Sequence, residues 1–295
     1  MPPSEKPRHR SGYTAEATLQ VRSACLSMVV SLGAFLDDLC VVGGFVPSLL
    51  IDSRPAQSKL GDGDDLHPGT RDLDMGLAAT LLDGERYAEL SSRLRQEGFE
   101  PDANESGQTT LQRWCHRDLD VTIDFLMAPL PGQGGSQRIQ ALEGDFGAVI
   151  TPGIELAFAE RVDVEIDGAI IGGGHAKRTI PVCGPAAFVV LKALAFGDRG
   201  EPKDAFDLVY VIRHTPNASP EIADRLVLHA RVQEDIVTKA LSLLQRDFEA
   251  VTSLGPSRAA AFEHVDRSDR ANAAADAHGH VVELLAACRV RGLTE

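Results

Sequence analysis

Apolar residues recur every three or four positions between residues 13 and 38, and this spacing predicts an amphipathic helix. The segment LCVVGG, residues 39–44, then predicts a short buried strand that ends in two glycines. The segment FVPSLLID, residues 45–52, resumes helical character, because Pro47 is acceptable in a first helical turn. The expected order is therefore helix, strand, glycine turn and helix.

A different pattern, strict alternation, marks two later segments. In RDLDMGLA, residues 71–78, every second residue is apolar, so Asp72 and Asp74 share the opposite face of a predicted strand. In LDVTIDFLM, residues 119–127, the same alternation puts Asp124 on a polar face. If these two strands are neighbours in one sheet, the three carboxylates form one cluster.

The remaining segments indicate a fold class. A helix is expected over residues 84–97, a hairpin joined at Arg117 and Asp118, and further short strands between 149 and 182. Residues 53–70 and 129–137 have the Gly, Pro, Ser and Asp content of flexible loops. After Gly184 the pattern is helical only, with helices expected at 185–196, 203–214, 220–229, 232–251 and 270–289.

These elements predict an α/β (α+β) protein in which a mixed sheet flanked by helices is followed by a C-terminal helical domain. We expect a flexible tail over residues 1–12, a mixed domain over 13–183 and a helical domain over 184–295.

Composition and charge narrow the class of protein. The 295 residues are 43% hydrophobic and 24% charged, as in ordinary globular proteins, and no apolar segment is long enough to span a membrane. The formal net charge of −14 opposes non-specific attraction to nucleic acid. The five cysteines are scattered and form no Cys-x-x-Cys pair, which favours a reduced, cytoplasmic location over a disulfide framework or zinc site.

The carboxylates point to cation chemistry. Like charges about 4 Å apart repel by roughly 4 kcal/mol per pair at an effective dielectric constant of 20, and divalent cations would remove that cost. Carboxylate oxygens select Mg²⁺ or Mn²⁺, and two such ions can clamp a phosphoryl transfer. The glycine pair Gly43 and Gly44, at the start of the expected helix, would offer backbone N–H groups to phosphate. Together these features predict metal-dependent chemistry on a triphosphate.

An ordered set of motifs resembles a known family. Each motif alone is a weak signal. Their order along the chain resembles that in the nucleotidyltransferases of the DNA polymerase β superfamily, most closely that in the AbiEii-type toxins of abortive-infection toxin–antitoxin systems. The resemblance extends over residues 39–214. The motifs are VVGG (41–44), Thr70-x-Asp72-x-Asp74, TIDFL (122–126), Lys192-Ala-Leu-Ala and KDAFDL (203–208).

The resemblance implies a nucleotidyltransferase fold and a role for each matching residue. Three strand residues would bind metal, and the last of them would accept the proton of the attacking hydroxyl: Asp72, Asp74 and Asp124. Seven residues would bind the nucleotide, with the helical lysine reaching the triphosphate and the KDxxD helix joining the same active site: Gly43, Gly44, Thr70, Lys192, Lys203, Asp204 and Asp207. Many members have Gly-Ser in place of the glycine pair, so a hydroxyl contact to phosphate is absent here.

Structural explanations compete with several of these roles. Lys192 lies among apolar residues and could be a snorkelling lysine on a core helix. Asp204 and its charged neighbours could simply suit the first turn of a helix, and Thr70 could terminate a loop. Asp120 is expected at the surface, and Trp114 in the core.

Two further motifs favour plain structural roles. The run Gly172-Gly173-Gly174 with Lys177 lacks the ending of a phosphate-binding loop and predicts a hairpin turn. The histidines at 264, 278 and 280 could suggest metal ligands, but two residues apart on a helix side chains diverge, so surface positions are expected.

The resemblance also implies the reaction. We expect transfer of a nucleoside monophosphate from an NTP to a hydroxyl, with Mg²⁺ or Mn²⁺ as cofactor and pyrophosphate as product. The implied acceptor is tRNA or another RNA, and the implied partner is a cognate antitoxin. A small molecule of the aminoglycoside type or a protein side chain stays open as acceptor. A non-catalytic nucleotide-binding module and a metal-dependent phosphohydrolase are the competing classes.

Overall fold

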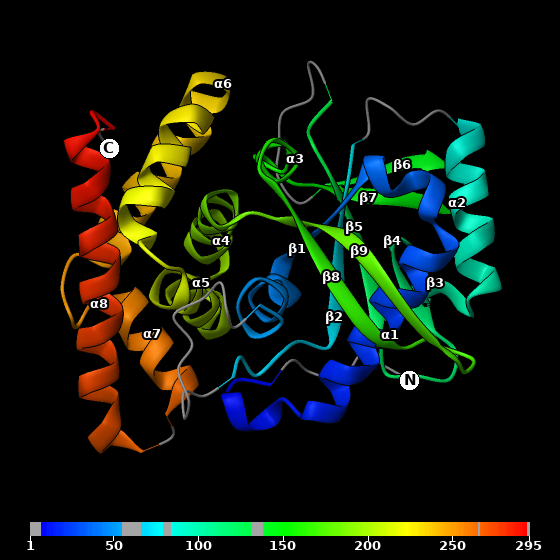
Figure 1. Ribbon diagram of the computed structural model, residues 1–295, viewed down its shortest axis with the longest axis horizontal. Helices are drawn as coiled ribbons and strands as arrows, with labels where there is room; N and C mark the ends of the chain where they lie inside the picture. Colours follow the sequence, from blue (N-terminus) through cyan, green and yellow to red (C-terminus); the bar gives the residue numbers. More distant parts are fainter. Residues whose placement is uncertain are drawn as a thin grey trace. The chain divides into compact units, whose positions relative to one another are not determined.

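A computed structural model shows how these segments are arranged (Figure 1). The expected loops at 53–70 and 129–137 and the expected tail at 1–12 lie partly outside the described residues. The structure describes residues 7–54, 66–78, 84–104, 106–130, 138–264 and 266–293.

The chain forms two compact units that are not consecutive in sequence. The sheet unit contains Thr14–Phe45 and Gly69–Cys183. The helical unit contains the chain from Gly184 onward, together with the described parts of Lys6–Tyr13 and Val46–Pro68. The segment after the glycine pair therefore clusters with the C-terminal helices rather than with the sheet that precedes it.

The sheet unit is built on one mixed sheet. Its strand order is β3-β4-β5-β2-β1-β9-β8, and β7 extends from β5 and carries β6. Among the described strands, most pairs are antiparallel, but three are parallel: β2 with β5, β1 with β9 and β5 with β7. The strands in the described residues are β1 (Leu39–Val42), β2 (Asp72–Leu77), β3 (Phe99–Ala103), β4 (Thr109–His116), β5 (Thr122–Met127), β6 (Ile139–Glu143), β7 (Phe146–Ile150), β8 (Arg161–Ala169) and β9 (His175–Cys183).

Alternation in the sequence correctly separated the buried face of the sheet from its polar face. Leu73 and Met75 of β2, with Ile123 and Phe125 of β5, are at most 2% exposed. Trp114 on β4 is fully buried, as expected. The predicted hairpin between β4 and β5 is present, and a glycine turn joins β8 to β9. Strands β3, β6 and β7 were not predicted, since their short segments carry no clear alternation.

Helices cover parts of this sheet. The helix expected over residues 13–38 is shorter: α1 (Ala15–Ser31) begins after Thr14, whose hydroxyl oxygen accepts from the Ala17 N–H at 3.2 Å. The 3₁₀ segment η2 (Gly33–Asp38) follows, because a glycine in this position favours leaving the α-helix. Helix α1 packs on β8 and β9, whereas α2 (Gly84–Gln96) packs on β3 and β6, and α3 (Glu155–Ala159) on β1 and β9.

The helical unit confirms the expected C-terminal helices. They are α4 (Pro185–Arg199), α5 (Pro202–His214), α6 (Ala218–Asp247), α7 (Leu254–Glu263) and α8 (Arg267–Val290). Helices α4 and α5 begin with a proline, which has no N–H to leave unpaired at a helix start. The two helices expected between 220 and 251 form one element with a kink at Gln233, and α7 was not predicted. Residues 10–12 form a 3₁₀ turn, η1 (Arg10–Gly12).

The helix expected over residues 45–52 is not a regular α-helix. A 3₁₀ turn, η3 (Gly43–Phe45), is followed by a π-helical turn, η4 (Ser48–Asp52), in which the Ser53 N–H donates to the Ser48 carbonyl at 2.9 Å. Pro47 lies between them and has no N–H to donate. The turn η4 packs on α5, and its apolar residues are buried on every side.

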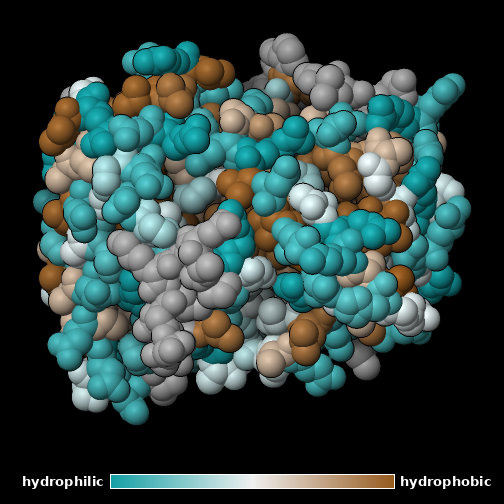
Figure 2. All heavy atoms as spheres, in the orientation of Figure 1, coloured by the Kyte–Doolittle hydropathy of each residue, from teal (hydrophilic) through white to brown (hydrophobic). Residues whose placement is uncertain are grey.

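On the face seen in Figure 2, hydrophilic residues cover most of the surface, and hydrophobic residues lie between them in small groups. Among the described residues, none of the helices combines the length and hydrophobicity that crossing a membrane requires.

Candidate functional site

The three strand carboxylates are neighbours in the sheet. Strands β2 and β5 pair in parallel, with Asp74 opposite Asp124 and Asp72 opposite Thr122. Paired residues project to the same face of a sheet, and neighbouring strands lie about 4.8 Å apart. The condition set by the sequence, that the two acidic strands be adjacent, is therefore met.

Two threonine hydroxyl groups hydrogen-bond to the first of these aspartates, one to its carboxylate and one to its backbone. Thr122 donates to Asp72 Oδ1 at 2.8 Å, and the hydroxyl oxygen of Thr70 accepts from the Asp72 N–H at 3.3 Å. Thr70 is 6% exposed, while Asp72 and Asp74 are half-buried. Thr70 therefore caps the beginning of β2 and lies directly beside the acidic pair.

The glycine pair lies against Asp74. Gly43 has a φ of +67°, and a Cβ there would lie 1.9 Å from Asp74 Oδ2, so a side chain is excluded by both conformation and space. The N–H of Gly44 donates to the same oxygen at 3.4 Å. The sequence predicted a phosphate site at the N-terminus of a helix. The residues that follow form 3₁₀ and π-helical turns rather than a regular α-helix, and the phosphate role of the glycine pair stays a prediction. In the structure, the glycine pair lets the end of β1 approach the Asp74 carboxylate.

A residue that the sequence analysis missed, Arg113, completes this group. Arg113 on β4 is paired with Asp124 on β5, and its guanidinium donates to both carboxylate oxygens, at 2.8 and 2.6 Å. This hydrogen-bonded contact raises the pKa of Arg113, and the charges of Asp72 and Asp74 add to the effect. The hairpin register could have revealed the contact between Arg113 and Asp124, because the two residues fall opposite each other when the strands are paired across residues 117–121.

Two of the three strand carboxylates have the chemistry that a divalent cation requires. Asp72 and Asp74 offer hard oxygen atoms on a half-buried face, which suits Mg²⁺, an ion often held by one or two carboxylates and substrate phosphates. Both oxygens of Asp124 accept from Arg113, and no three acidic, histidine or cysteine side chains in the described residues are grouped closely enough to hold a metal. The pair of β2 aspartates fits the ion, and Asp124 is engaged elsewhere.

The remaining predicted residues form a second cluster, inside the helical unit. Lys192 of α4 donates to Asp204 Oδ1 and Asp207 Oδ2, both at 2.8 Å. Lys203 donates to the two oxygens of Asp207 at 2.8 and 2.9 Å. Asp207 is fully buried and Asp204 is 3% exposed. The aspartates of the KDxxD motif therefore fix the two lysines.

Charges within this cluster compensate one another. Burial alone would raise the pKa of Asp204, but Lys192 and the guanidinium of Arg199, at 2.6 Å, lower it to about 2. Burial alone would likewise lower the pKa of Lys192, but Asp204 and Asp207 raise it above its usual range. Lys192 is 6% exposed and remains charged. It is an anchored cation rather than a freely snorkelling one.

His67 is the second residue that the sequence analysis missed. Its Nε2 lies 2.9 Å from Asp207 Oδ1, and its Nδ1 lies 3.3 Å from the Ser48 hydroxyl. Burial and the positive charge of Lys203 lower its pKa to about 4, so the ring is neutral near pH 7. The neighbours fit a tautomer that donates from Nε2 to Asp207 and accepts at Nδ1 from Ser48. No local sequence signal marks His67, because it follows a long segment without periodicity.

The ten predicted residues thus fall into two clusters. In the sheet unit the structure brings together Gly43, Gly44, Thr70, Asp72, Asp74 and Asp124. In the helical unit it brings together Lys192, Lys203, Asp204 and Asp207.

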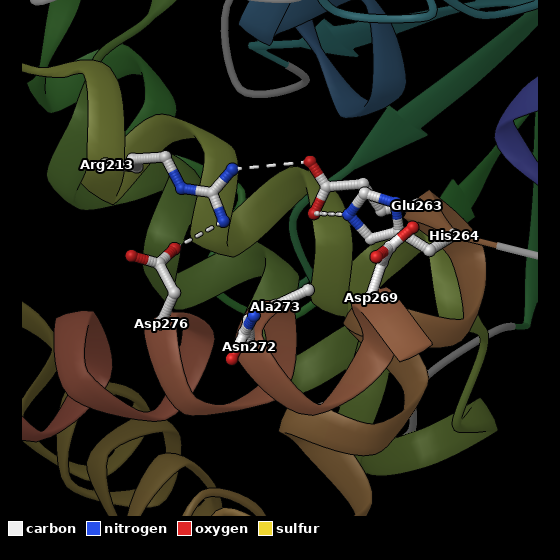
Figure 3. Close-up of a pocket in the computed structure, with 7 residues that line it drawn as sticks. All are labelled: Arg213, Glu263, His264, Asp269, Asn272, Ala273 and Asp276. Atoms are coloured by element: carbon white, nitrogen blue, oxygen red, sulfur yellow. Dashed lines mark hydrogen bonds and ion pairs between the residues drawn. The ribbon is translucent and has the colours of Figure 1, made fainter. Parts of the chain in front are cut away.

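A separate polar pocket of about 430 Å³ lies at the other end of α5 (Figure 3). Arg213, nine residues or about 13 Å of helix from Asp204, donates to Glu263 of α7 at 3.4 Å and to Asp276 of α8 at 2.5 Å. The pocket's lining also includes His264 beside Glu263. Its one guanidinium is paired by these carboxylates, and nothing in it matches the motifs above.

Comparison with known protein families identifies the family of the chain. Residues 69–278 match the family model described as nucleotidyl transferase AbiEii toxin, type IV TA system, which is more than two thirds of the chain. The chain belongs to the AbiEii family. No curated protein sequence matches it significantly.

The AbiEii match covers the strand carboxylates and the Lys–Asp cluster, and it extends through α7 into α8. It begins at residue 69, so the glycine pair of the predicted motif lies before it. The expected resemblance to AbiEii-type nucleotidyltransferases is confirmed, and helices α4 to α7 with the first part of α8 belong to the matched region. As an AbiEii member, this chain is a nucleotidyltransferase toxin of the type IV toxin–antitoxin class.

Proposed function

We propose that this AbiEii-family protein transfers a nucleoside monophosphate from an NTP to a hydroxyl acceptor and releases pyrophosphate. The acceptor oxygen attacks the α-phosphorus, and the bond from that phosphorus to the oxygen bridging the α- and β-phosphates breaks. Asp72 and Asp74 are the groups that would hold Mg²⁺ or Mn²⁺. When bound, such an ion would polarise a phosphate oxygen as a Lewis acid.

One observation carries this proposal: the parallel register that puts Asp74 beside Asp124, with Asp72 on the same face. Solvated surface aspartates need no such convergence, and the face is closed on one side by a glycine that admits no Cβ. Thr70 lies at the start of β2, beside the same carboxylates, and this position suits a role in binding the phosphates. In this proposal Asp124 accepts the acceptor's proton only after its guanidinium contact is released.

Lys192 is proposed to stabilise the triphosphate. An ammonium has three N–H donors, and the contacts with Asp204 and Asp207 use two of them. Lys203 and the two aspartates would hold that ammonium in a fixed position and charge state. Fixed cations of this kind act on phosphates as point charges.

The acceptor and the regulating partner are proposed from membership of the AbiEii family. We propose tRNA or another RNA as acceptor, in the cytoplasm, and a cognate antitoxin as the regulating partner. A net charge of −14 opposes general binding of RNA, so recognition would depend on a local feature of the acceptor.

The proposal is tested with the full chain, radiolabelled NTPs, Mg²⁺ and three acceptor pools: tRNA, lysate protein and aminoglycosides. Asp72→Asn and Asp74→Asn should each reduce transfer at least about 100-fold while the fold is kept. Asp120→Asn is the matched control, since the Asp120 side chain is 67% exposed and pairs with Arg71, and the two residues lie just before β5 and β2. Full transfer by both strand variants would refute the assigned roles.

The position of the label distinguishes the competing functions. Label on tRNA supports the proposed acceptor. Label on protein or on an aminoglycoside identifies that molecule as the acceptor instead. Calorimetric binding of NTP without release of pyrophosphate would favour a non-catalytic module. Release of nucleoside diphosphate or free monophosphate without a labelled acceptor would favour a phosphohydrolase.

A further inference from the structure

A row of paired residues crosses the polar face of the sheet unit. Successive strands contribute one residue each, in the order Arg113 of β4, Asp124 of β5, Asp74 of β2 and Val42 of β1. Because neighbouring strands lie about 4.8 Å apart, the Cα of Arg113 is one strand from Asp124 and two from Asp74. The positively charged residue Arg113 therefore lies in the same row as the proposed metal ligands.

The contact between Arg113 and Asp124 is two-pronged and partly shielded from water. The Nε and Nη2 atoms donate to separate oxygens of Asp124 at 2.8 and 2.6 Å. The side chains of Arg113 and Asp124 are 27% and 14% exposed. Bidentate pairs of this type are among the strong charge-assisted hydrogen bonds. A metal ion could use Asp124 only where the guanidinium releases an oxygen.

We propose that Arg113 is the resident counter-cation of the strand carboxylates and competes with a divalent cation for Asp124. The inference rests on the proposed function in one respect, that these carboxylates form the cation site. Arg113 is a positioning residue in this scheme, because it acts through Asp124 and not on the nucleotide. Its consequence is that the free protein binds divalent cations weakly and holds them first on Asp72 and Asp74.

The test is a calorimetric titration of the full chain with MnCl₂, without nucleotide. Removing the guanidinium in Arg113→Gln should strengthen Mn²⁺ binding about 10-fold or more, within the usual range of coupling between two sites. The matched control is Arg71→Gln, which removes an equal charge from the neighbouring ion pair with Asp120 and should change the affinity less than about 2-fold. In a double variant with Asp124→Asn, the gain should disappear.

Folding is controlled separately. Arg113→Lys keeps a charge but loses the two-pronged contact, so it should bind Mn²⁺ with an affinity between those of the wild type and Arg113→Gln. If Arg113→Gln unfolds in EDTA but folds in Mn²⁺, that result also supports competition. If Arg113→Gln folds in neither EDTA nor Mn²⁺, the Mn²⁺ affinity of Arg113→Lys is compared with that of the Arg71→Gln control instead.

Four results would overturn the inference. The first is an Mn²⁺ affinity no higher than that of the wild type in Arg113→Gln or, where that variant does not fold, in Arg113→Lys. The second is an equal gain in Mn²⁺ affinity in Arg71→Gln. The third is a gain that persists in the double variant. Absence of Mn²⁺ binding in every variant would overturn it as well. Because the titration contains no NTP and no acceptor, these failures are separable from failure of the transfer assay.

Discussion

Two groups of charged residues in this molecule carry the predicted motifs, and they are built on opposite principles. In the sheet unit, three carboxylates share a half-buried face with the guanidinium of Arg113. In the helical unit, Asp204 and Asp207 are almost wholly buried and are met by three cations: Lys192, Lys203 and Arg199.

The difference teaches how to assign roles within one motif set. Buried charges are tolerated only when they are paired and hydrogen-bonded, so the helical cluster has the features of a self-compensated scaffold with a surplus of positive charge. The strand cluster keeps a surplus of negative charge on a face that water and ions can reach. Removing a carboxylate should therefore lower stability in the helical cluster and raise it in the strand cluster.

The largest effect is expected in the helical cluster. Asp207→Asn removes the charge that binds Lys192, Lys203 and His67, and breaking a buried pair in this way costs about 3–5 kcal/mol. Urea denaturation measures the loss. Asp224→Asn is the control, because Asp224 pairs with Arg291 at the surface of the same unit and its loss should leave the midpoint unchanged. Equal effects of the two variants would erase the distinction between the clusters.

His67 should give the helical cluster a pH dependence. Burial lowers the pKa of its ring from 6.5 to about 4, so its contribution is complete above pH 6.5 and is lost as the pH falls toward 4. The shift corresponds to roughly 3 kcal/mol. Asp52, whose pKa burial raises to about 6, acts in the opposite direction, because its contribution is lost as the pH rises through 6.

Unfolding free energies of the wild type and His67→Asn, measured between pH 4 and 7, check this expectation. The variant should lose less stability than the wild type on acidification. His175→Asn is the control, since that side chain is 67% exposed, and it should keep the pH dependence of the wild type. Parallel curves for His67→Asn and the wild type would contradict the assigned role.

An intermediate effect is expected where the strand cluster meets the glycine pair. Gly43→Ala combines a left-handed backbone with a Cβ 1.9 Å from Asp74 Oδ2, so a loss of about 1–3 kcal/mol is expected, with a displaced Asp74 and weaker nucleotide transfer. Thermal denaturation and the transfer assay measure both losses. In Gly33→Ala, the control, the new methyl group meets nothing within 4 Å, and no loss of activity is expected.

The smallest effect should have the opposite sign. Asp74→Asn removes one of two carboxylates on directly paired positions, so in EDTA the variant should be more stable than the wild type by about 0.2–1 kcal/mol. Adding Mn²⁺ should stabilise the wild type more than the variant. A destabilised variant in EDTA would show that Asp74 has a scaffold role like that of Asp207.

The sequence by itself determined the local elements that carry the site. Alternation in residues 71–78 and 119–127 was sufficient to put Asp72, Asp74 and Asp124 on the polar faces of two strands, because the period of a strand is fixed by its backbone. The order of the motifs was sufficient to identify the family. Helical periodicity likewise found α4 and α5, since their apolar faces are long and regular.

Only the tertiary structure decided which charges meet. The parallel pairing of β2 with β5 depends on strand order across 44 intervening residues, and no local pattern encodes it. The contacts of Arg113 with Asp124 and of His67 with Asp207 are likewise set by neighbours from other segments. Long-range pairing and packing chose these partners, because free energy of burial and charge compensation depend on which segments are brought together, and not on the segments alone.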